Sequence, residues 1–363
     1  MPAYLTALGT SLPPFGFSQR DLLDFMIKAH QLSADEAHQL SVLYRASGIQ
    51  KRHSVLADFG QKSEDQTFFP NNKSLEPFPD TRKRMDTYFE NALPLSLNAI
   101  ESGRINTEGI THLITVTCTG LQAPGLDIQL LSHLHIKQGV ERYGIQFMGC
   151  YAAIPALRLA KSLCESKPDS KVLIVCLELC TLHFQKEPTA DNLLANCLFA
   201  DGCAAALVSA NKGTDACFEI MDSFSAIIDE GKDDMAWHAG IFGFEMKLSQ
   251  QIPAILQKHI VKLRGSLEAA LGKEIDTNWE FAIHPGGKGI VESIGRAFEL
   301  EKEKLIFSLK VLREHGNMSS PTILFVLKEF MNMGFRENKD ILSLAFGPGL
   351  SFEALHLTYH ARF

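Results

Sequence analysis

The chain has 363 residues, 45% of them hydrophobic and 21% charged, and its formal net charge at pH 7 is −7. These values are ordinary for a globular protein, and the length suffices for two domains or one large layered unit. The chain has no long basic tract, which argues against nucleic acid and anionic membranes as partners. No apolar run approaches the roughly 18 residues that a membrane-spanning helix needs, so we expect no membrane span.

The eight cysteines indicate the expected compartment. Residues 1–5 show neither the basic nor the apolar region of a secretory signal, so we expect a cytoplasmic protein with reduced thiols. Cys176 and Cys180 are separated by three residues, but no further pair of Cys or His completes a zinc pattern. We therefore expect no metal site.

Capping and turn residues predict the elements of the first hundred residues. Ser18 and Asp21 have the spacing of a capping box and predict the start of a helix. The basic cluster of Lys51, Arg52 and His53 is typical of a solvated face. In chain order we predict a strand at 3–8 that is broken at 9–14, the capped helix, a helix at 33–47, a loop at 58–79 and a helix at 82–101.

Beyond residue 110 the pattern changes to short, near-continuous apolar runs. Such runs are typical of strands that helices cover on both faces, as in α/β sheets. We predict strands at 112–117, 171–177 and 203–209, and a helix at 126–134 after the Gly/Pro loop that begins at Cys118.

Cys150 is the candidate nucleophile. The run 145–148 predicts a buried strand, Gly149 permits a sharp turn, and an amphipathic helical pattern begins at or beside Cys150. A thiol at the N-terminus of a helix faces unpaired N–H groups, which favours the thiolate and suits a nucleophile. The alternative is a buried cysteine that acts as a small hydrophobic side chain.

The second half of the chain repeats the pattern of the first. A strand at 279–283 ends in His284-Pro285-Gly286-Gly287, as an earlier strand ends at Cys118. The stretch 199–202 with its strand resembles 345–349 with the strand that follows it. These repeats predict an internal duplication, with one half at 1–214 and the other at 215–363.

His284 and Asn317 lie on two loops of the second half, each next to glycine. An imidazole and a carboxamide can both donate hydrogen bonds to a carbonyl oxygen that gains negative charge. Beside a cysteine thiolate, this set supports the condensation of thioesters. Taken singly, His284 is also explained as a turn residue and Asn317 as a helix cap. The order of the three motifs along the chain is more specific than any one of them.

Five motifs carry a resemblance that covers nearly the whole chain: Gly149-Cys150, 198–202, 284–287, 316–320 and 346–349. Together they resemble the type III polyketide synthases, the chalcone/stilbene synthase family of the thiolase superfamily. The resemblance implies an α/β subunit with a five-layered αβαβα fold, and a homodimer. It also implies that Cys150, His284 and Asn317 form the catalytic triad, and that Phe199 is a gatekeeper between a CoA tunnel and the substrate cavity.

Several positions depart from the plant members of that family. Met246 stands where those enzymes have a second gatekeeper phenylalanine, and Ala123 where a methionine reaches across the dimer. The basic residues that grip the CoA phosphates are poorly matched, and Arg45, Lys51 and Arg52 are the substitutes. The other positions of the substrate cavity that the resemblance implies are Cys118, Thr119, Cys180, His183, Ser319, Phe346, Gly347 and Pro348. These departures look bacterial, argue against a flavonoid starter, and favour an aliphatic acyl-CoA that yields alkylpyrones or alkylresorcinols.

The implied activity needs no cofactor beyond the CoA thioester substrates. An acyl-CoA starter loads onto Cys150, malonyl-CoA extends it by repeated decarboxylative Claisen condensation, and the product cyclises. One alternative is a condensing enzyme of the ketoacyl–carrier-protein synthase III type, which shares the Cys-His-Asn set. Another is a non-catalytic partner subunit of a ketosynthase. A degradative thiolase is disfavoured, because the C-terminal loop offers no second cysteine.

Overall fold

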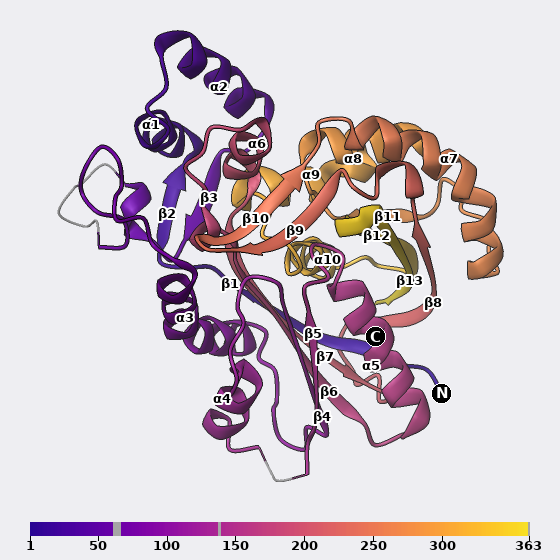
Figure 1. Ribbon diagram of the computed structural model, residues 1–363. Coiled ribbons are helices and arrows are strands. Elements are labelled where there is room, and N and C mark those ends of the chain that lie inside the picture. The colour runs from indigo at the N-terminus through magenta and orange to yellow at the C-terminus, as the bar shows by residue number, and fades with distance from the viewer. Residues whose placement is uncertain (61–66, 137–138, 362–363) are drawn as a thin grey trace.

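The computed structural model describes residues 1–60, 67–136 and 139–361 (Figure 1). Within these ranges nine strands join into one sheet. Its order is β11 (Glu280–Ile283), β12 (Lys339–Gly347), β13 (Ser351–His360), β8 (Cys217–Ile227), β1 (Tyr4–Ser11), β7 (Asp201–Ser209), β6 (Lys171–Leu179), β4 (His112–Thr117) and β5 (Glu141–Gln146). Two strand pairs stand apart from it: β2 (Phe15–Ser18) with β3 (Lys51–Ser54), which α1 and α2 separate in the chain, and the hairpin of β9 (Met235–Gly240) with β10 (Gly243–Leu248).

The sheet contains the same arrangement twice, as the sequence repeats predict. In the first half β7 is antiparallel to both β1 and β6, and β6 is parallel to β4. In the second half β13 is antiparallel to both β8 and β12, and β12 is parallel to β11. The two halves join where β1 pairs with β8 through Tyr4 and Leu5. The strand that ends before Cys118 therefore corresponds to the strand that ends before His284.

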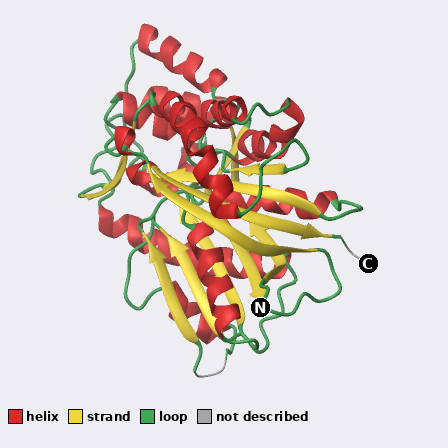
Figure 2. Cartoon of the chain, turned by 90° about the vertical axis from the view of Figure 1, so that its right-hand side faces the viewer, coloured by secondary structure: helices red, strands yellow, loops and turns green. Residues whose placement is uncertain are grey.

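Helices and the two halves of the sheet form five layers (Figure 2). The helices are α1 (Gln19–Ala29), α2 (Ala34–Ala46), α3 (Thr81–Ser102), α4 (Leu126–His133), α5 (Ala153–Ser166), α6 (Ala190–Leu198), α7 (Ile252–Leu271), α8 (Lys288–Ala297), α9 (Ile306–His315) and α10 (Thr322–Met333). Buried side chains of α5 and α10 share one core with strands of both halves. Helices α3 and α4 pack on the outer face of the first half, and α7 and α8 on the outer face of the second, while α1 and α2 pack on each other beside the β2–β3 pair. This is the αβαβα order that the family resemblance implies.

Local capping explains where the first two helices begin. The Ser18 side chain accepts a hydrogen bond from the Asp21 N–H, while the Asp21 carboxylate accepts one from the Ser18 N–H. Ser33 and Glu36 make the same reciprocal pair at the start of α2. Each pair satisfies N–H groups that have no partner inside the helix, so the predicted capping box is confirmed.

Strand β1 does not break at Gly9, contrary to our prediction. It continues to Ser11, with Gly9 opposite Ala205 of β7. A side chain at Gly9 would place its Cβ 2.0 Å from the Ala99 carbonyl oxygen, because α3 crosses the strand there. The glycine marks a close approach of two backbones rather than a turn.

The strand before Cys150 also differs from the prediction. We expected a buried strand at 145–148, but β5 spans Glu141–Gln146 and its residues alternate between exposed and half-buried. It is the outermost strand and pairs only with β4. The helix that follows begins at Ala153, so Cys150 lies on the turn between strand and helix, as the sequence predicts.

The predicted loop at 58–79 is described only in part, since residues 61–66 lie outside the described ranges. After a short 3₁₀ turn at Ala57–Phe59, the Asp58 carboxylate accepts hydrogen bonds from the N–H groups of Phe68 and Phe69 and ties the loop down. Among the described residues, no helix combines the length and apolar character needed to cross a membrane.

Candidate active site

Gly149 sets the path of the turn that carries Cys150. Its φ is +82°, and a Cβ at this position would lie 2.3 Å from Cδ of Pro348. Pro348 belongs to the loop between β12 and β13, so the glycine lets that loop approach the cysteine turn. The two halves of the chain meet closely at this point.

Gly149→Ala is expected to lower the free energy of unfolding by about 2–4 kcal/mol, the sum of a positive φ and an overpacked contact. Gly213→Ala is the matched control, because Gly213 has a φ of +68° but no atom within 4 Å of a Cβ. We expect only about 1 kcal/mol for the control. Urea unfolding of both variants measures the difference, and equal losses would contradict the role of the Pro348 contact.

Asn317 is held beside Cys150 by backbone pairing with the end of α6. The Asn317 N–H donates to the Leu198 carbonyl at 2.9 Å, and the Ala200 N–H donates to the Asn317 carbonyl at 2.8 Å. The Asn317 carboxamide Nδ2 donates to the Gly286 carbonyl at 3.2 Å, and both Nδ2 and Oδ1 lie 3.9 Å from the Cys150 sulfur. The amide is thus fixed, with a donor facing the space next to the thiol.

His284 completes the group from the end of β11. Its N–H donates to the Leu344 carbonyl of β12 at 2.8 Å, which extends the parallel pairing by one residue. The ring is buried, and its two nitrogens have no hydrogen-bond partner among the described residues. A buried imidazole without a partner is uncommon, because a lost hydrogen bond is unfavourable in the interior. Such a ring is available to a ligand in the cavity that it lines.

Burial sets the protonation of both groups in the empty site. It raises the pKa of the Cys150 thiol to about 11, although hydrogen bonding to Ser319 opposes the shift. It also lowers the pKa of His284 to about 3. In the empty site, burial therefore favours the neutral thiol and the neutral imidazole, and it opposes the thiolate that we expect from the helix terminus.

One central cavity brings most of the predicted residues together. Those that line it are Cys118, Thr119, Cys150, Cys180, Phe199, Met246, His284, Asn317, Ser319, Phe346 and Pro348. Gly347 instead packs against the ring of Tyr151, where a Cβ would lie 2.5 Å from the ring. Residues from both halves of the chain therefore face one enclosed space.

His183 does not line the central cavity. Its Nδ1 accepts a hydrogen bond from the Phe244 N–H at 2.9 Å, so Nε2 carries the proton and donates to the Thr119 carbonyl at 2.8 Å. The ring also stacks on Phe244 with centroids 4.3 Å apart. Both nitrogens are occupied by the protein, so His183 acts as a support of the cavity wall.

Arg52 is buried and does not lie on the solvated face that its charged neighbours suggest. The side chain is only 3% exposed. Its Nε donates to Gln19 and its Nη1 to the Phe199 carbonyl, so the guanidinium holds the backbone of Phe199 in place. Arg45 and Lys51 are exposed, as residues that meet a ligand phosphate must be.

The comparisons with known proteins decide the family. The model of the N-terminal domain of chalcone and stilbene synthases matches residues 1–212, and that of their C-terminal domain matches residues 219–359. The chain belongs to this family. It is a type III polyketide synthase by membership, the class of enzyme that the motifs indicate.

Individual relatives and a solved structure support this family assignment. Type III polyketide synthase A of Arabidopsis thaliana is 30% identical, over 97% of this chain and 92% of that protein. A polyketide synthase of Dictyostelium discoideum is 29% identical over 98% of this chain, which spans only 11% of that protein's length. The solved C-terminal type III polyketide synthase domain of Steely1 from Dictyostelium is 26% identical, with 98% and 99% of the two chains covered and a TM-score of 0.88.

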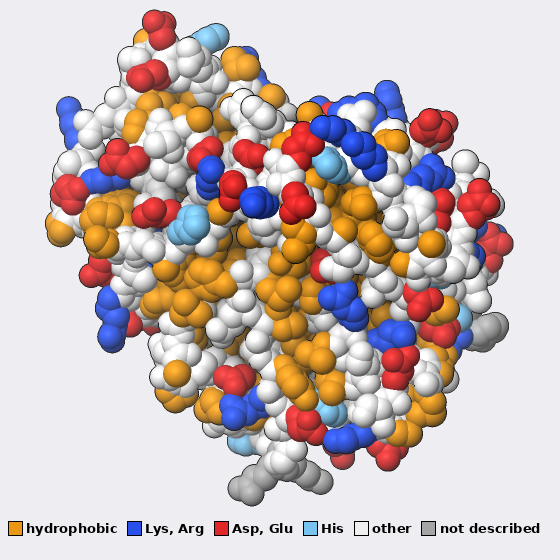
Figure 3. All heavy atoms as spheres, turned by 45° about the vertical axis from the view of Figure 1, so that its right-hand side comes forward, with side chains coloured by type: hydrophobic (Ala, Val, Ile, Leu, Met, Phe, Trp, Pro, Cys, Tyr) orange, Lys and Arg blue, Asp and Glu red, His pale blue; other side chains and the backbone are white. Residues whose placement is uncertain are grey.

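Two outer cavities of this polyketide synthase adjoin the central one. The first, which we call the α2–α8 cleft, lies among Ser47, Leu194, Pro253 and Lys288, and shares Gly286 and Ile290 among others with the central cavity. Figure 3 shows a notch in the molecule between the N-terminal helices and the helices of the second half, with basic and acidic side chains interspersed around it.

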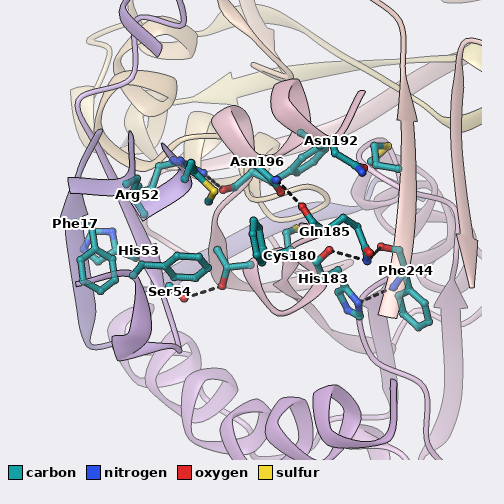
Figure 4. A pocket seen from close by; sticks show the side chains of 18 of the residues that line it. Phe17, Arg52, His53, Ser54, Cys180, His183, Gln185, Asn192, Asn196 and Phe244 are labelled. Atoms are coloured by element: carbon teal, nitrogen blue, oxygen red, sulfur yellow. Dashed lines mark hydrogen bonds between the residues drawn. The ribbon is translucent and has the colours of Figure 1, made fainter. Parts of the chain in front are cut away.

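The second, which we call the N-terminal cavity, lies between α1, β3 and α6 (Figure 4). Its apolar wall comes mainly from Phe17, Leu22, Met26, Phe59, Phe184 and Phe244.

Sequence reasoning missed two residues of the polyketide synthase site. Glu178 is fully buried behind the central cavity and accepts hydrogen bonds from the Thr119 and Ser320 hydroxyls, both at 2.7 Å. It thereby joins the loop after β4 to the loop of Asn317. The sequence offered one signal for Glu178, because an acidic residue within an apolar strand is unusual. Trp237 donates from its indole N–H to the Cys118 carbonyl at 2.7 Å and lines the central cavity. No pattern in the sequence marks it.

Proposed function

We propose that this chain is a CoA-dependent type III polyketide synthase that loads an acyl-CoA starter onto Cys150 and extends it with malonyl-CoA. The observation that carries the proposal is the central cavity, where a thiol, an unpartnered imidazole and a fixed carboxamide from three distant loops face one buried space. A family member with a buried cysteine of purely structural use has no need of the other two groups.

Loading begins with a proton transfer. An unpartnered nitrogen of His284 takes the proton of the Cys150 thiol, and the thiolate attacks the thioester carbonyl of the starter. The new carbon–sulfur bond forms as the CoA thiolate leaves, and CoA departs as a thiol with the proton from His284. Each charge of the transient ion pair offsets the desolvation of the other, which is why two buried neutral groups can react this way.

Extension uses His284 and Asn317 as donors. The thioester carbonyl oxygen of malonyl-CoA accepts hydrogen bonds from the His284 N–H and from Asn317 Nδ2. Carbon dioxide leaves, and the electron pair of the broken carbon–carbon bond forms an enolate whose negative oxygen these donors stabilise. The enolate carbon attacks the acyl-Cys150 thioester and displaces the cysteine sulfur. In a cavity that excludes water, fixed donors act more strongly than in solution.

The α2–α8 cleft is the proposed path for CoA. The exposed Lys288 lines it, the exposed Arg45 precedes Ala46 of its wall in α2, and the first turn of α8 offers N–H groups to an anion. Lys51 is a further candidate phosphate partner. The unpaired outer edge of β5 supports the proposal that two copies associate as a homodimer. Met246, a flexible side chain in the cavity wall, supports an aliphatic starter that gives an alkylpyrone or alkylresorcinol.

The test is the mass of the intact protein after incubation with a panel of acyl-CoA esters. We expect one acyl adduct per chain, located on Cys150 by peptide mapping and absent from Cys150→Ala. Addition of malonyl-CoA should then release extended, cyclised products. Malonyl carrier protein is the contrasting extender. Product from the carrier protein but not from malonyl-CoA would favour the synthase III type, and an unmodified Cys150 would favour a non-catalytic subunit.

A further inference from the structure

Arg52 binds the C-terminal end of α6. Its Nη1 donates to the Phe199 carbonyl, and its Nε donates at 2.9 Å to the side-chain oxygen of Gln19. The Gln19 amide in turn donates to the Cys197 carbonyl at 2.9 Å. The last carbonyls of a helix have no partner inside it, and the negative end of the helix dipole favours a cation. The guanidinium and the Gln19 amide therefore fix the end of α6 and the residue that follows it.

The same stretch of backbone holds Asn317. Phe199 forms a parallel bridge with Asn317, in which the Asn317 N–H donates to the Leu198 carbonyl and the Ala200 N–H donates to the Asn317 carbonyl. The Phe199 carbonyl and the Ala200 N–H belong to one planar peptide unit. Arg52 and Asn317 therefore bind the two ends of the same rigid group, and a rotation of that group would break both bonds.

Arg52 also contacts the residue before Asn317. Gly316 has a φ of +72°, and a Cβ at this position would lie 2.8 Å from both Cγ and Cδ of Arg52. The methylene groups of the arginine therefore pack on the Gly316 backbone. The guanidinium contacts one side of the bridge that carries Asn317, and the methylene groups contact the other side.

We propose that Arg52 is a positioning residue for Asn317, whose carboxamide is the oxyanion donor of the extension step. The inference rests on the proposed function and adds to it a residue that acts only through backbone contacts. The carboxamide Nδ2 lies 3.9 Å from the Cys150 sulfur, and a misplacement of about 1 Å can slow a reaction by about 10²-fold. His284 is held separately, because its N–H donates to the Leu344 carbonyl of β12. Arg52 therefore affects the carboxamide and leaves the imidazole in place.

Arg52→Lys tests the inference, because lysine keeps the charge but lacks the fork that bonds to Gln19 and Phe199 together. The measurement is the steady-state decarboxylation of malonyl-CoA to acetyl-CoA and carbon dioxide, which needs the oxyanion donors but no acyl starter. We expect kcat to fall by about 10- to 10²-fold, with KM nearly unchanged. Acylation of Cys150 by acetyl-, hexanoyl- or dodecanoyl-CoA, read by intact mass, should proceed at nearly the wild-type rate.

A double-mutant cycle with Asn317→Ala shows whether Arg52 acts through the amide. Once the amide is absent, Arg52→Lys should slow decarboxylation further by less than about twofold, whereas a general structural role would slow both backgrounds by the same factor. Tyr44→Phe is the matched control. The Tyr44 hydroxyl donates to the Asn196 carbonyl at 3.2 Å, so its loss removes a bond at the same end of α6 but away from the bridge to Asn317. We expect its kcat to be unchanged.

Chemical rescue provides an independent measurement. Arg52 lines the N-terminal cavity together with Asn196 of α6, and its Nη2 has no hydrogen-bond partner among the described residues (Figure 4). The cavity therefore gives a small cation access to the position of the guanidinium. Ethylguanidinium has the atoms that Arg52→Ala removes, and we expect it to raise decarboxylation by Arg52→Ala several-fold. It should have no effect once Asn317→Ala is also present.

The outcomes separate the two proposals. An unchanged kcat in Arg52→Lys, or an equal loss in both backgrounds, overturns Arg52 as a positioning residue and leaves the proposed function standing. A wild-type protein that neither decarboxylates malonyl-CoA nor takes an acyl group overturns the proposed function and this inference with it. Circular dichroism verifies the fold. If Arg52→Lys does not fold, Gln19→Met, which removes the acceptor of Arg52 Nε, replaces it in the cycle, and the same pattern is expected with a smaller loss.

Discussion

Asn317→Ala is expected to slow condensation by about 10²–10³-fold, the usual effect of removing one oxyanion donor. The amide donor lies 3.9 Å from the Cys150 sulfur and is held by the Gly286 carbonyl and by backbone pairing with α6. The donor stabilises the enolate of malonyl-CoA, whereas loading of the starter depends on the proton transfer from Cys150 to His284. We therefore expect the acyl adduct on Cys150 to form at a nearly normal rate while its extension fails.

Single-turnover kinetics separate the two steps, with adduct formation read by intact mass and extension by product release. Alanine also leaves the Ser319 N–H without its acceptor, the Asn317 Oδ1 at 2.9 Å. Asn317→Asp is the control, because aspartate keeps the acceptor and lacks the donor. Extension by Asn317→Asp at the wild-type rate would show that the amide donor is not needed. Asn317→Asp keeps the hydrogen bond to the Ser319 N–H. Loss of extension in both variants would therefore show that the missing amide donor, and not a disturbed loop, is the cause.

Local patterns were sufficient to predict much of the fold. The capping pairs at Ser18 and Ser33 depend on residues three apart, so the starts of α1 and α2 follow from the sequence alone. Helices cover β4, β6 and β7 on both faces, so these strands are continuous apolar runs that the sequence predicts clearly. The repeat of a strand ending at Cys118 and at His284 indicated the duplication, and with it two equivalent loops at one edge of the structure.

Where the prediction failed, a distant element decided the outcome. Gly9 looked like a strand break, but it lies where the backbone of α3 crosses β1, a contact made across ninety residues. The stretch before Cys150 looked like a buried strand, yet β5 lies at the edge of the sheet and pairs on one side only. Arg52 looked solvated because its neighbours are charged. It is buried because Gln19 and the Phe199 carbonyl surround it.

In the candidate site, too, sequence patterns predicted some features and tertiary packing decided the others. The order of the motifs along the chain indicated Cys150, His284 and Asn317, and the structure places all three around one cavity. Burial could not be predicted, and it opposes the expected ionisation of Cys150, since desolvation raises the thiol pKa more than the nearby donors lower it. Trp237 reaches the cavity through the pairing of β9 with β10, which no local pattern reveals. Side chains that shape a cavity are set by tertiary packing, and their identity carries no periodic signal.

His284→Gln is expected to lower the rate of Cys150 alkylation by iodoacetamide at pH 7 by about 10²-fold or more. Burial raises the pKa of the Cys150 thiol to about 11, so without a proton acceptor the thiol is ionised to only about one part in 10⁴ at that pH. In the proposed mechanism the imidazole accepts the proton, so we expect the wild-type pair to titrate together at a lower apparent pKa. The rate in His284→Gln should therefore keep rising with pH beyond pH 9, whereas the wild-type rate should level off at lower pH. Peptide mapping assigns the alkylated cysteine.

The glutamine variant also separates the two tasks assigned to His284. Its side-chain amide can donate a hydrogen bond but cannot accept the thiol proton at neutral pH. Malonyl-CoA decarboxylation, which needs a donor, should survive in His284→Gln better than in His284→Ala, while acyl loading should be lost in both. Equal loading by His284→Gln and the wild type would mean that another group ionises Cys150. The buried imidazole would then serve only as an oxyanion donor.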